Sequence, residues 1–174
     1  MEAESVEEIP TDEGWQYEPK WDGFRCLAYR DDGDVELRSK AGQPLGRYFP
    51  EIVAAVAAVK AKRFALDGEL VIAQGGALSF DDLLLRLHPA ASRVQKLAAA
   101  TPAWLVVFDL LEDEKGESLV VRPLKERREK LEAFAEKFFE QGGALRLSPA
   151  TTELKVAKKW FGEAGTSLDG LIAK

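Results

Sequence analysis

The pattern of apolar and polar residues predicts a β-hairpin near the start of the chain. Residues 23–29 and 35–39 alternate between the two types, and an acidic stretch with one glycine, residues 31–34, separates them. Alternation with a period of two is typical of strands that bury one face, and an Asp-Gly pair between such strands favours a tight turn. Residues 64–72 are predicted to form a further strand, which ends at the turn of residues 74–76.

Apolar residues spaced by three and four positions predict helices elsewhere. Residues 48–60 and 152–161 show this spacing, and the longest helix is expected after Pro123, a residue that suits a first helical turn. Ser79 and the acidic residue three positions later resemble a capping box, so another helix is expected from there to Leu87.

A nearly continuous apolar run at residues 103–111 predicts a strand buried on both faces. Residues 145–147 and 168–173 are predicted to form two shorter strands. Predicted strands slightly outnumber predicted helices, and the series begins with a hairpin. These features favour an α+β fold in which largely antiparallel sheets are flanked by helices.

Composition narrows the class of protein. A chain of 174 residues with 46% hydrophobic and 31% charged residues is expected to form one globular unit. Its single cysteine, Cys26, and single histidine, His88, exclude an internal disulfide and a zinc-finger ligand set. The longest apolar run, residues 52–59, is too short to span a membrane, and no basic segment precedes Lys20 as in a signal peptide. We therefore expect a cytoplasmic protein without a membrane partner. A monomer is the default expectation, because the sequence carries no signal for its oligomeric state.

The negative charge is concentrated at the N-terminus. Residues 1–13 carry six of the 30 acidic residues and no basic residue, whereas residues 14–174 have as many basic as acidic residues. We expect residues 1–13 to be a disordered acidic leader and residues 14–174 to form one domain. Because this domain has no net positive charge, its affinity for DNA is expected to be weak.

The segment richest in candidate functional residues is 18–25, Glu-Pro-Lys-Trp-Asp-Gly-Phe-Arg. It contains the spacing K-x-D-G-x-R. On its own it is equally consistent with a β-turn at Asp22-Gly23 beside a solvated lysine. Three further acidic groups lie within or beside predicted strands: Asp67-Gly68-Glu69, Phe108-Asp109 and Asp169-Gly170. Carboxylates in apolar strands are costly unless a cation or hydrogen-bond donors compensate them. Their recurrence suggests that they converge on one site.

Together these motifs resemble the nucleotidyltransferase, or adenylation, domain of ATP-dependent DNA ligases, most closely the small bacterial type associated with DNA repair. Five segments match the family's motifs in order: K-x-D-G-x-R at residues 20–25, a variant of S-R-x-G at 38–42, D-G-E at 67–69, the motif with an aromatic residue at 106–110, and E-G-x-x-x-K at 169–174. The resemblance implies the nucleotidyltransferase fold. It also implies an enzyme that forms a lysyl-AMP intermediate from ATP and transfers the AMP to the 5′-phosphate of a nick in DNA.

The resemblance further implies roles for individual residues. Lys20 is implied to be the catalytic nucleophile, whose amine attacks the α-phosphorus of ATP and is reactive only when deprotonated. The other implied ATP-binding residues are Glu18 at the adenine amino group, Phe108 stacked on adenine, Arg25 and Glu69 at the ribose, and Lys40 and Lys174. Glu69 and Asp169 are the implied ligands of Mg²⁺, a hard cation that prefers oxygen ligands.

Some features depart from the family pattern. Asp169 replaces the usual glutamate, Lys40 replaces an arginine, and the chain ends before the family's next lysine pair and its C-terminal OB-fold domain. We therefore expect a C-terminally truncated domain that binds ATP weakly, adenylates itself slowly or not detectably, and does not seal nicks alone. Two alternatives remain: an RNA ligase or capping-type nucleotidyltransferase, which shares K-x-D-G, and a catalytically silent nucleotide-binding fragment.

Overall fold

A computed structural model describes residues 4–87, 90–163 and 168–174. The chain divides into two compact units: unit 1 comprises Met1–Asp22 and Ser148–Lys174, and unit 2 comprises Gly23–Leu147. The sequence predicts one domain from residue 14 onward and does not indicate this division. This division reflects contacts within each unit and does not test the expected boundary between an acidic leader and the domain at residue 14. That boundary stays a prediction.

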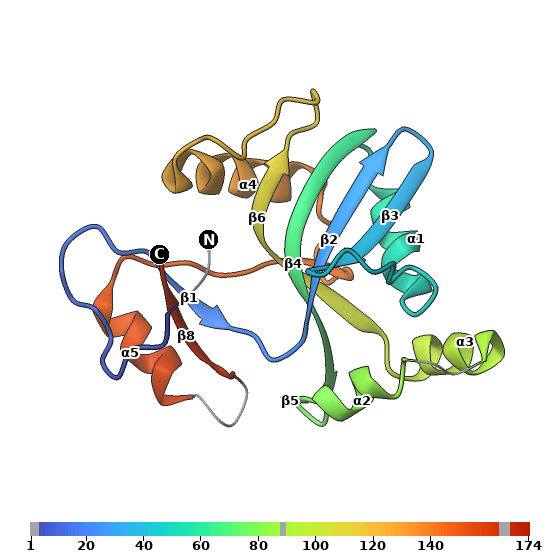
Figure 1. Ribbon diagram of the computed structural model, residues 1–174, viewed down its shortest axis with the longest axis horizontal. Coiled ribbons are helices and arrows are strands. Elements are labelled where there is room, and N and C mark those ends of the chain that lie inside the picture. The colour runs from blue at the N-terminus through green and yellow to red at the C-terminus, as the bar shows by residue number, and fades with distance from the viewer. Residues whose placement is uncertain (1–3, 88–89, 164–167) are drawn as a thin grey trace. The chain divides into compact units, whose positions relative to one another are not determined.

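Unit 2 is built on a six-stranded sheet (Figure 1). Five strands follow the order β3-β2-β4-β6-β7, and β5 pairs with one end of β4. The strands are β2 (Phe24–Asp31), β3 (Asp34–Ser39), β4 (Arg63–Gln74), β5 (Ala77–Leu78), β6 (Ala103–Glu112) and β7 (Leu145–Leu147). Among these described strands every pairing is antiparallel except that of β6 with β7. The expected α+β fold with largely antiparallel sheets is confirmed.

The predicted hairpin is confirmed as β2 and β3. Asp31 pairs with Asp34, which leaves a two-residue loop of Asp32 and Gly33. Asp32 has a φ of 48°, a left-handed conformation that aspartate adopts more readily than most residues. The strands predicted at residues 64–72, 103–111 and 145–147 correspond to β4, β6 and β7.

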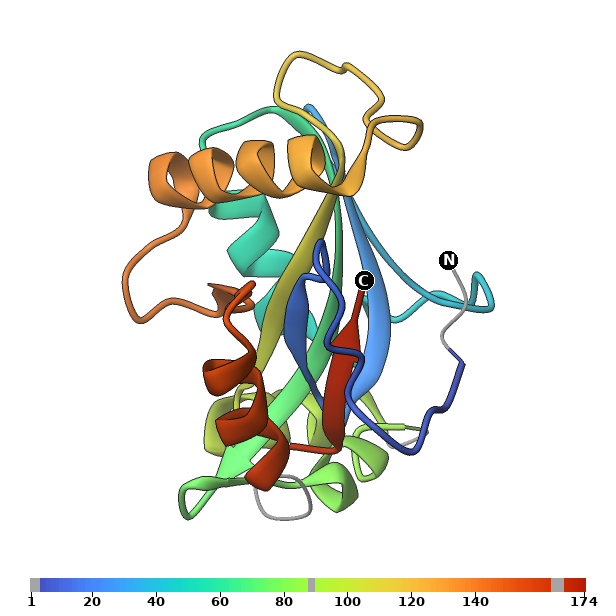
Figure 2. The ribbon, with the colours of Figure 1, turned by 90° about the vertical axis from the view of Figure 1, so that its left-hand side faces the viewer.

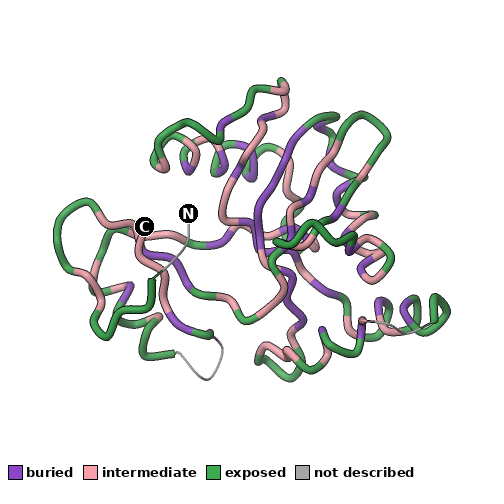
Figure 3. Tube along the Cα trace, viewed as in Figure 1, coloured by how far each residue is buried: buried purple, intermediate pink, exposed green. Residues whose placement is uncertain are grey.

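Two helices cover one face of the sheet of unit 2, as Figure 2 shows: α1 (Pro50–Ala58) and α4 (Leu124–Phe138). Ile52 and Val56 of α1 and Leu131 and Phe134 of α4 are buried in the same apolar cluster as the inner side chains of the strands. Burying one such side chain is worth about 1.5–3 kcal/mol. Figure 3 shows the buried positions along the strands and on the inner sides of both helices.

The short helices α2 (Phe80–Leu84) and α3 (Ala91–Ala100) follow β5. Asp82 donates its backbone N–H to the Ser79 hydroxyl oxygen at 3.3 Å, as the capping pattern predicts. The helix nevertheless ends before the predicted Leu87, because the next amides bond three residues back and tighten the turn. His88 and Pro89 directly follow the predicted helix, where a proline is expected to stop it and the histidine to lie on the surface; both lie outside the described residues.

The buried Arg86 lies in this tightened turn. Its guanidinium donates to the carbonyl oxygens of Tyr48 and Thr101 and forms an ion pair with Glu51 at 2.7 Å. One buried cation thus links the start of α1 to the segments on either side of α3. A buried charge needs such a set of partners to offset its lost hydration.

Unit 1 contains an antiparallel pair of strands, β1 (Tyr17–Lys20) and β8 (Gly170–Ala173), with helix α5 (Leu154–Gly162) packed against them. The predicted helix at residues 152–161 and the predicted final strand are confirmed as α5 and β8. Strand β1 was not predicted from the sequence.

The described part of the acidic leader, residues 4–13, contains neither helix nor strand, and most of its residues are exposed. The Tyr17 hydroxyl donates a hydrogen bond to the carbonyl oxygen of Pro10 at 2.7 Å, so the last part of this segment contacts β1. Disorder of the leader stays a prediction. Among the described helices, none combines the length and the apolar character that crossing a membrane requires.

Candidate functional site

The β1–β8 pair of unit 1 fixes the backbone of the K-x-D-G lysine. Lys20 lies opposite Gly170, and the backbone N–H of Asp169 donates to the carbonyl oxygen of Lys20 at 2.8 Å. Glu18, two positions before Lys20, points to the same face of the strand because side chains alternate. Gly170 has a φ of 149°, which side-chain-bearing residues rarely adopt, so the glycine after Asp169 is required by the backbone.

The Lys20 ammonium group forms an ion pair with the carboxylate of Asp169. The two side chains are 49% and 47% exposed, so a dissolved ligand can reach both groups. Exposed ion pairs of this kind add little to fold stability. The pair therefore positions the lysine amine more than it stabilises unit 1.

Glu18 is buried, with 2% of its surface exposed, and its carboxylate has two hydrogen-bond donors. Lys174 Nζ donates to Oε2 at 2.7 Å, and Gln16 Nε2 donates to Oε1 at 2.7 Å. These donors compensate a charge that would otherwise be costly to bury. Gln16 was not predicted from the sequence because it lies outside the motif. Gln16 lies two positions before Glu18, and side chains two positions apart on an extended chain point to the same face. That spacing could have indicated the contact.

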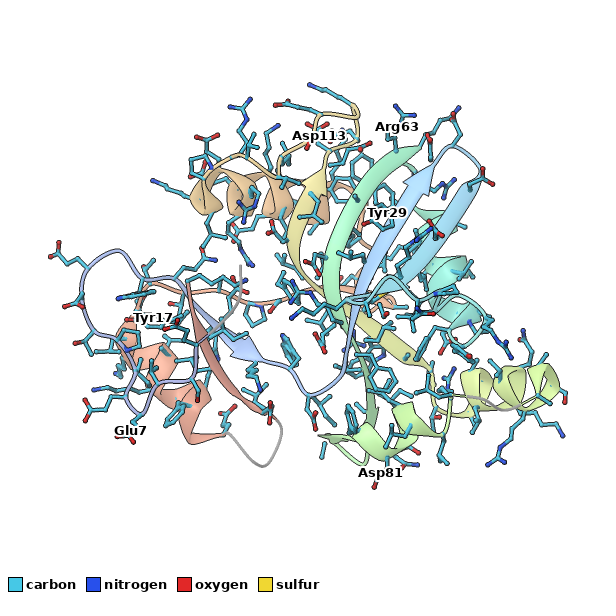
Figure 4. All side chains as sticks on the ribbon, in the orientation of Figure 1. Glu7, Tyr17, Tyr29, Arg63, Asp81 and Asp113 are labelled. Carbon is cyan, nitrogen blue, oxygen red and sulfur yellow. The ribbon has the colours of Figure 1, made fainter. Side chains whose placement is uncertain are left out.

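Strand β1 is also held on its second edge. Tyr17, labelled in Figure 4, exchanges two backbone hydrogen bonds with Thr151, at 2.8 and 2.9 Å. Directly after the strand, Trp21 Nε1 donates to the hydroxyl of the buried Ser148 at 3.0 Å. Lys20 is therefore at the end of a strand that is fixed on both sides.

In unit 2, Arg25 is bound from two directions. Its guanidinium makes a two-pronged ion pair with Asp67, with 2.6 Å between Nη2 and Oδ2, and lies 4.4 Å from the centre of the Phe108 ring. Burial lowers the pKa of Arg25, but the hydrogen bond and charge of Asp67 outweigh burial and raise its pKa above the ordinary value. The expectation that the carboxylates of Asp67-Gly68-Glu69 need a cation is confirmed for Asp67. Glu69 lies opposite Arg25 in the strand register.

Two glycines of D-G motifs in unit 2, Gly23 and Gly68, allow close approach of backbones. A Cβ atom at Gly68 would lie 2.6 Å from the carbonyl oxygen of Val106, where the register between β4 and β6 shifts. A Cβ atom at Gly23 would overlap the carbonyl oxygen of Leu70. A side chain at Gly68 would push β4 away from β6, and one at Gly23 would push the start of β2, which carries Arg25, away from β4, which carries Asp67.

Lys40 is exposed and follows β3. It lines a groove of about 370 Å³ together with Gly23, Phe24, Arg25, Ser39, Ala41, Leu45 and Leu87. The structure thus brings Lys40 and Arg25 to one groove of unit 2.

Basic and acidic residues interleave at positions 122–130, which predicts a mostly solvated helix face, but this prediction is wrong for two arginines. Arg127 is 11% exposed and donates to both carboxylate oxygens of Asp109, at 2.9 and 3.0 Å. Arg128 is buried and forms an ion pair with Glu132 at 2.6 Å. Since Asp109 follows Phe108 in β6, Arg127 anchors the part of the strand that carries the aromatic residue. A charge pattern along one helix does not reveal a carboxylate on a strand beside it.

The implied site residues fall into two groups, each described within its own unit. Unit 1 holds Glu18, Lys20, Asp169 and Lys174, and unit 2 holds Arg25, Lys40, Glu69 and Phe108. Within the described ranges, no three His, Cys, Asp or Glu side chains gather as a metal-ligand cluster. Mg²⁺ commonly takes one or two carboxylates and completes its shell with phosphate oxygens and water. Single carboxylates such as Asp169 and Glu69 therefore fit that cation.

An α+β fold with the K-x-D-G lysine at the end of a strand and the other motifs around it is typical of the nucleotidyltransferase class. Comparison with known families gives the assignment. The model of the ATP dependent DNA ligase domain matches residues 1–174, and the chain belongs to this family.

Similar proteins include DNA ligase C2 of Mycolicibacterium smegmatis, 47% identical, and DNA ligase C of Mycobacterium tuberculosis, 45% identical, each over all of this chain. The chain spans 48% of the length of each.

Solved structures of the same family have similar folds. The ligase domain of M. tuberculosis LigD has a TM-score of 0.67 at 26% identity, and mycobacterial DNA ligase D complexed with ATP and MES has a TM-score of 0.64 at 25% identity. Each match covers 92% of this chain and 48% of the solved chain. The predicted family and the predicted ligase adenylation fold are confirmed.

Proposed function

We propose that this chain is the adenylation part of an ATP-dependent DNA ligase that acts on nicked DNA. The observation that carries the proposal is the position of Lys20, half exposed at the end of β1 with its ammonium group paired to Asp169. Membership of the ligase family supports it. So does the ATP complex of mycobacterial DNA ligase D, a relative of similar fold.

The proposed first step is nucleophilic substitution at phosphorus. The deprotonated Nζ of Lys20 attacks the α-phosphorus of ATP and forms a nitrogen–phosphorus bond. The bond from that phosphorus to the oxygen shared with the β-phosphate breaks, and pyrophosphate leaves. Asp169 is in contact with Nζ and can accept the proton that the amine releases.

Two transfers complete the proposed reaction. An oxygen of the 5′-phosphate at the nick attacks the adenylate phosphorus, and Lys20 leaves with its electron pair. The 3′-hydroxyl then attacks the activated 5′-phosphate, which forms the phosphodiester bond and releases AMP. The protein's part in these steps is to hold the reacting groups in line.

The ATP contacts are proposed residue by residue. In unit 1, Glu18 accepts a hydrogen bond from the adenine amino group, with its carboxylate held by Gln16 and Lys174. Because a carboxylate would repel the carbonyl oxygen that guanine has at this position, Glu18 favours ATP over GTP. Use of GTP would instead favour the capping-type alternative.

In unit 2, Phe108 is proposed to stack on adenine, Arg25 and Glu69 to bind the ribose, and Lys40 to bind phosphate. Asp169 and Glu69 are the proposed ligands of Mg²⁺, which when bound neutralises negative charge on the phosphates. We further propose that the protein is a cytoplasmic monomer that serves DNA repair.

The test is covalent labelling with α-labelled ATP and Mg²⁺. The wild-type chain is expected to acquire label slowly, and Lys20→Arg is expected to acquire none, because a guanidinium group stays protonated near neutral pH. Lys62→Arg, at an exposed lysine of unit 2, is the matched control and should label like the wild type. Equal labelling of Lys20→Arg and wild type would contradict the proposal.

A further inference from the structure

The basic side chains of unit 1 are unevenly placed. Unit 1 has five, all of them lysines. Lys20 and Lys174 are in ion pairs with carboxylates. The remaining three, Lys155, Lys158 and Lys159, are all on helix α5 and all exposed, and none forms an ion pair with a described residue.

These three lysines form one face of α5. Their spacings of three and four residues put them side by side on the helix, about 6 Å from first to last along its axis. Ala157, on the other side of the helix, is buried. Residues 154–162 include no acidic residue, and Phe161, one turn after Lys158, is 51% exposed. Figure 1 shows α5 beside the β1–β8 pair of the same unit.

Helix α4 of unit 2 is a useful contrast because four of its five basic side chains are in ion pairs, Lys125 being the exception among the described residues. Its ion pairs are Arg127–Asp109, Arg128–Glu132, Lys130–Asp113 and Lys137–Glu114. On α5, by contrast, like charges three and four residues apart repel one another and weaken the helix. Helix stability therefore does not explain the lysine face, and a bound anion would relieve the repulsion.

We propose that Lys155, Lys158 and Lys159, with Phe161 at their edge, bind the phosphate backbone of the duplex beside the nick. This inference rests on the proposed function. Contacts to phosphates do not depend on base sequence, which suits an enzyme that acts at any nick. Three adjacent cations match a polyanion in charge, whereas the chain as a whole has a net charge of −6. Because α5 packs on β1 and β8, this face holds DNA to the unit that carries Lys20.

The experiment compares nicked-duplex binding by wild type and by the triple variant Lys155→Gln, Lys158→Gln, Lys159→Gln, using fluorescence anisotropy over a range of salt concentrations. Affinity at low salt is expected to fall on the order of tenfold. The slope of log affinity against log salt should decrease by about 0.9 for each phosphate that the variant no longer neutralises. The control variant Arg122→Gln, Lys130→Gln, Lys137→Gln removes the same charge from ion-paired positions and should weaken binding much less.

Labelling by α-labelled ATP is measured on the same samples and separates this inference from the proposed function. The α5 variant should label as wild type does, and absence of label in both would count against the proposed function alone. Three results overturn the inference: no DNA binding by wild type at low salt, unchanged binding by the α5 variant, or equally weakened binding by the control. A vesicle-binding assay with phosphatidylserine gives a fourth result that would overturn the inference. If the α5 variant keeps DNA binding but loses the vesicle binding of the wild type, the lysine face belongs to a membrane contact.

Discussion

At the scale of single residues, Arg25, Asp67 and Phe108 show how a side chain of the candidate site is held. The carboxylate of Asp67 orients the guanidinium from one side, and the ring of Phe108 lies at 4.4 Å from its central carbon. A guanidinium fixed in this way loses little freedom when it meets a ligand. The cost of burying Asp67 made the need for a cation predictable from the sequence. Which cation pairs with Asp67 could not be predicted, because it depends on how β2 and β4 align.

Phe108→Ala tests whether the ring serves ATP or only the fold. Base stacking on an aromatic side chain is worth about 1–3 kcal/mol, so ATP affinity should fall by that amount if Phe108 stacks on adenine. A purely structural ring would instead cost about 3–5 kcal/mol of stability when removed. Calorimetric titration with ATP and a thermal melt of the same variant distinguish the two. A large drop in melting temperature with unchanged ATP affinity would refute the stacking role.

The sequence predicted the motif residues better than it predicted their partners. Glu18, Lys20 and Asp169 lie in or beside one strand pair, as expected of residues that serve one site. Gln16 and Arg127, which hold Glu18 and Asp109, carry no motif of their own. Such partners depend on which segments become neighbours, and the pattern of a single segment does not contain that information.

At the scale of elements, the loop between β6 and α4 depends on Asp113, labelled in Figure 4. The buried carboxylate accepts hydrogen bonds from the backbone N–H groups of Lys115 and Glu117, each at 3.0 Å, and from Lys130 at 3.1 Å. Burial raises the pKa of Asp113, but these donors outweigh burial and hold its pKa below the ordinary value of 3.8. The ionised form is therefore favoured in the folded chain.

Asp113→Asn is expected to reduce the free energy of unfolding by about 2 kcal/mol at pH 7. Because the folded-state pKa is depressed, the stabilisation is complete above about pH 4 and is lost as the pH falls through that lowered pKa. The difference between wild type and variant should therefore shrink in urea unfolding below about pH 4. Glu114→Gln, which removes the neighbouring ion pair with Lys137, should cost about 0.5 kcal/mol or less. A difference that is independent of pH would contradict this role.

Helices and strands with a clear hydrophobic period were predictable from the sequence. Elements that form only because other segments pair with them were not. The hairpin, β4, β6, α1 and α4 follow from alternation, a continuous apolar run or helical spacing. Strand β1 contains Pro19 and two charged residues in four positions, and it is extended because β8 and Thr151 pair with it. Helix α3 was not predicted because four of its ten residues are small alanines beyond its one apolar pair, Val94 and Leu97, and alanine gives no clear helical stripe of large apolar side chains.

At the scale of the whole molecule, the apolar core belongs to unit 2. Every residue of the described core cluster lies between Cys26 and Leu145. Residues 23–147, expressed alone, are therefore expected to unfold cooperatively, with a free energy in the range of about 5–15 kcal/mol typical of single domains. Urea unfolding followed by circular dichroism checks this expectation. A broad transition without cooperativity would show that unit 2 needs the two chain segments of unit 1.

The pairing of β1 with β8 has a consequence for the order of events during synthesis. Lys20 leaves the ribosome early, but Asp169 and the strand after it follow 149 residues later. At about 5–20 residues per second, the lysine waits roughly 8–30 s for its partner. Unit 2, which lies wholly between them in the sequence, can fold during that interval. A chain interrupted anywhere within unit 2 would therefore leave the ribosome with Lys20 but without the strand that positions it, so under the proposed function unfinished copies could not react with ATP.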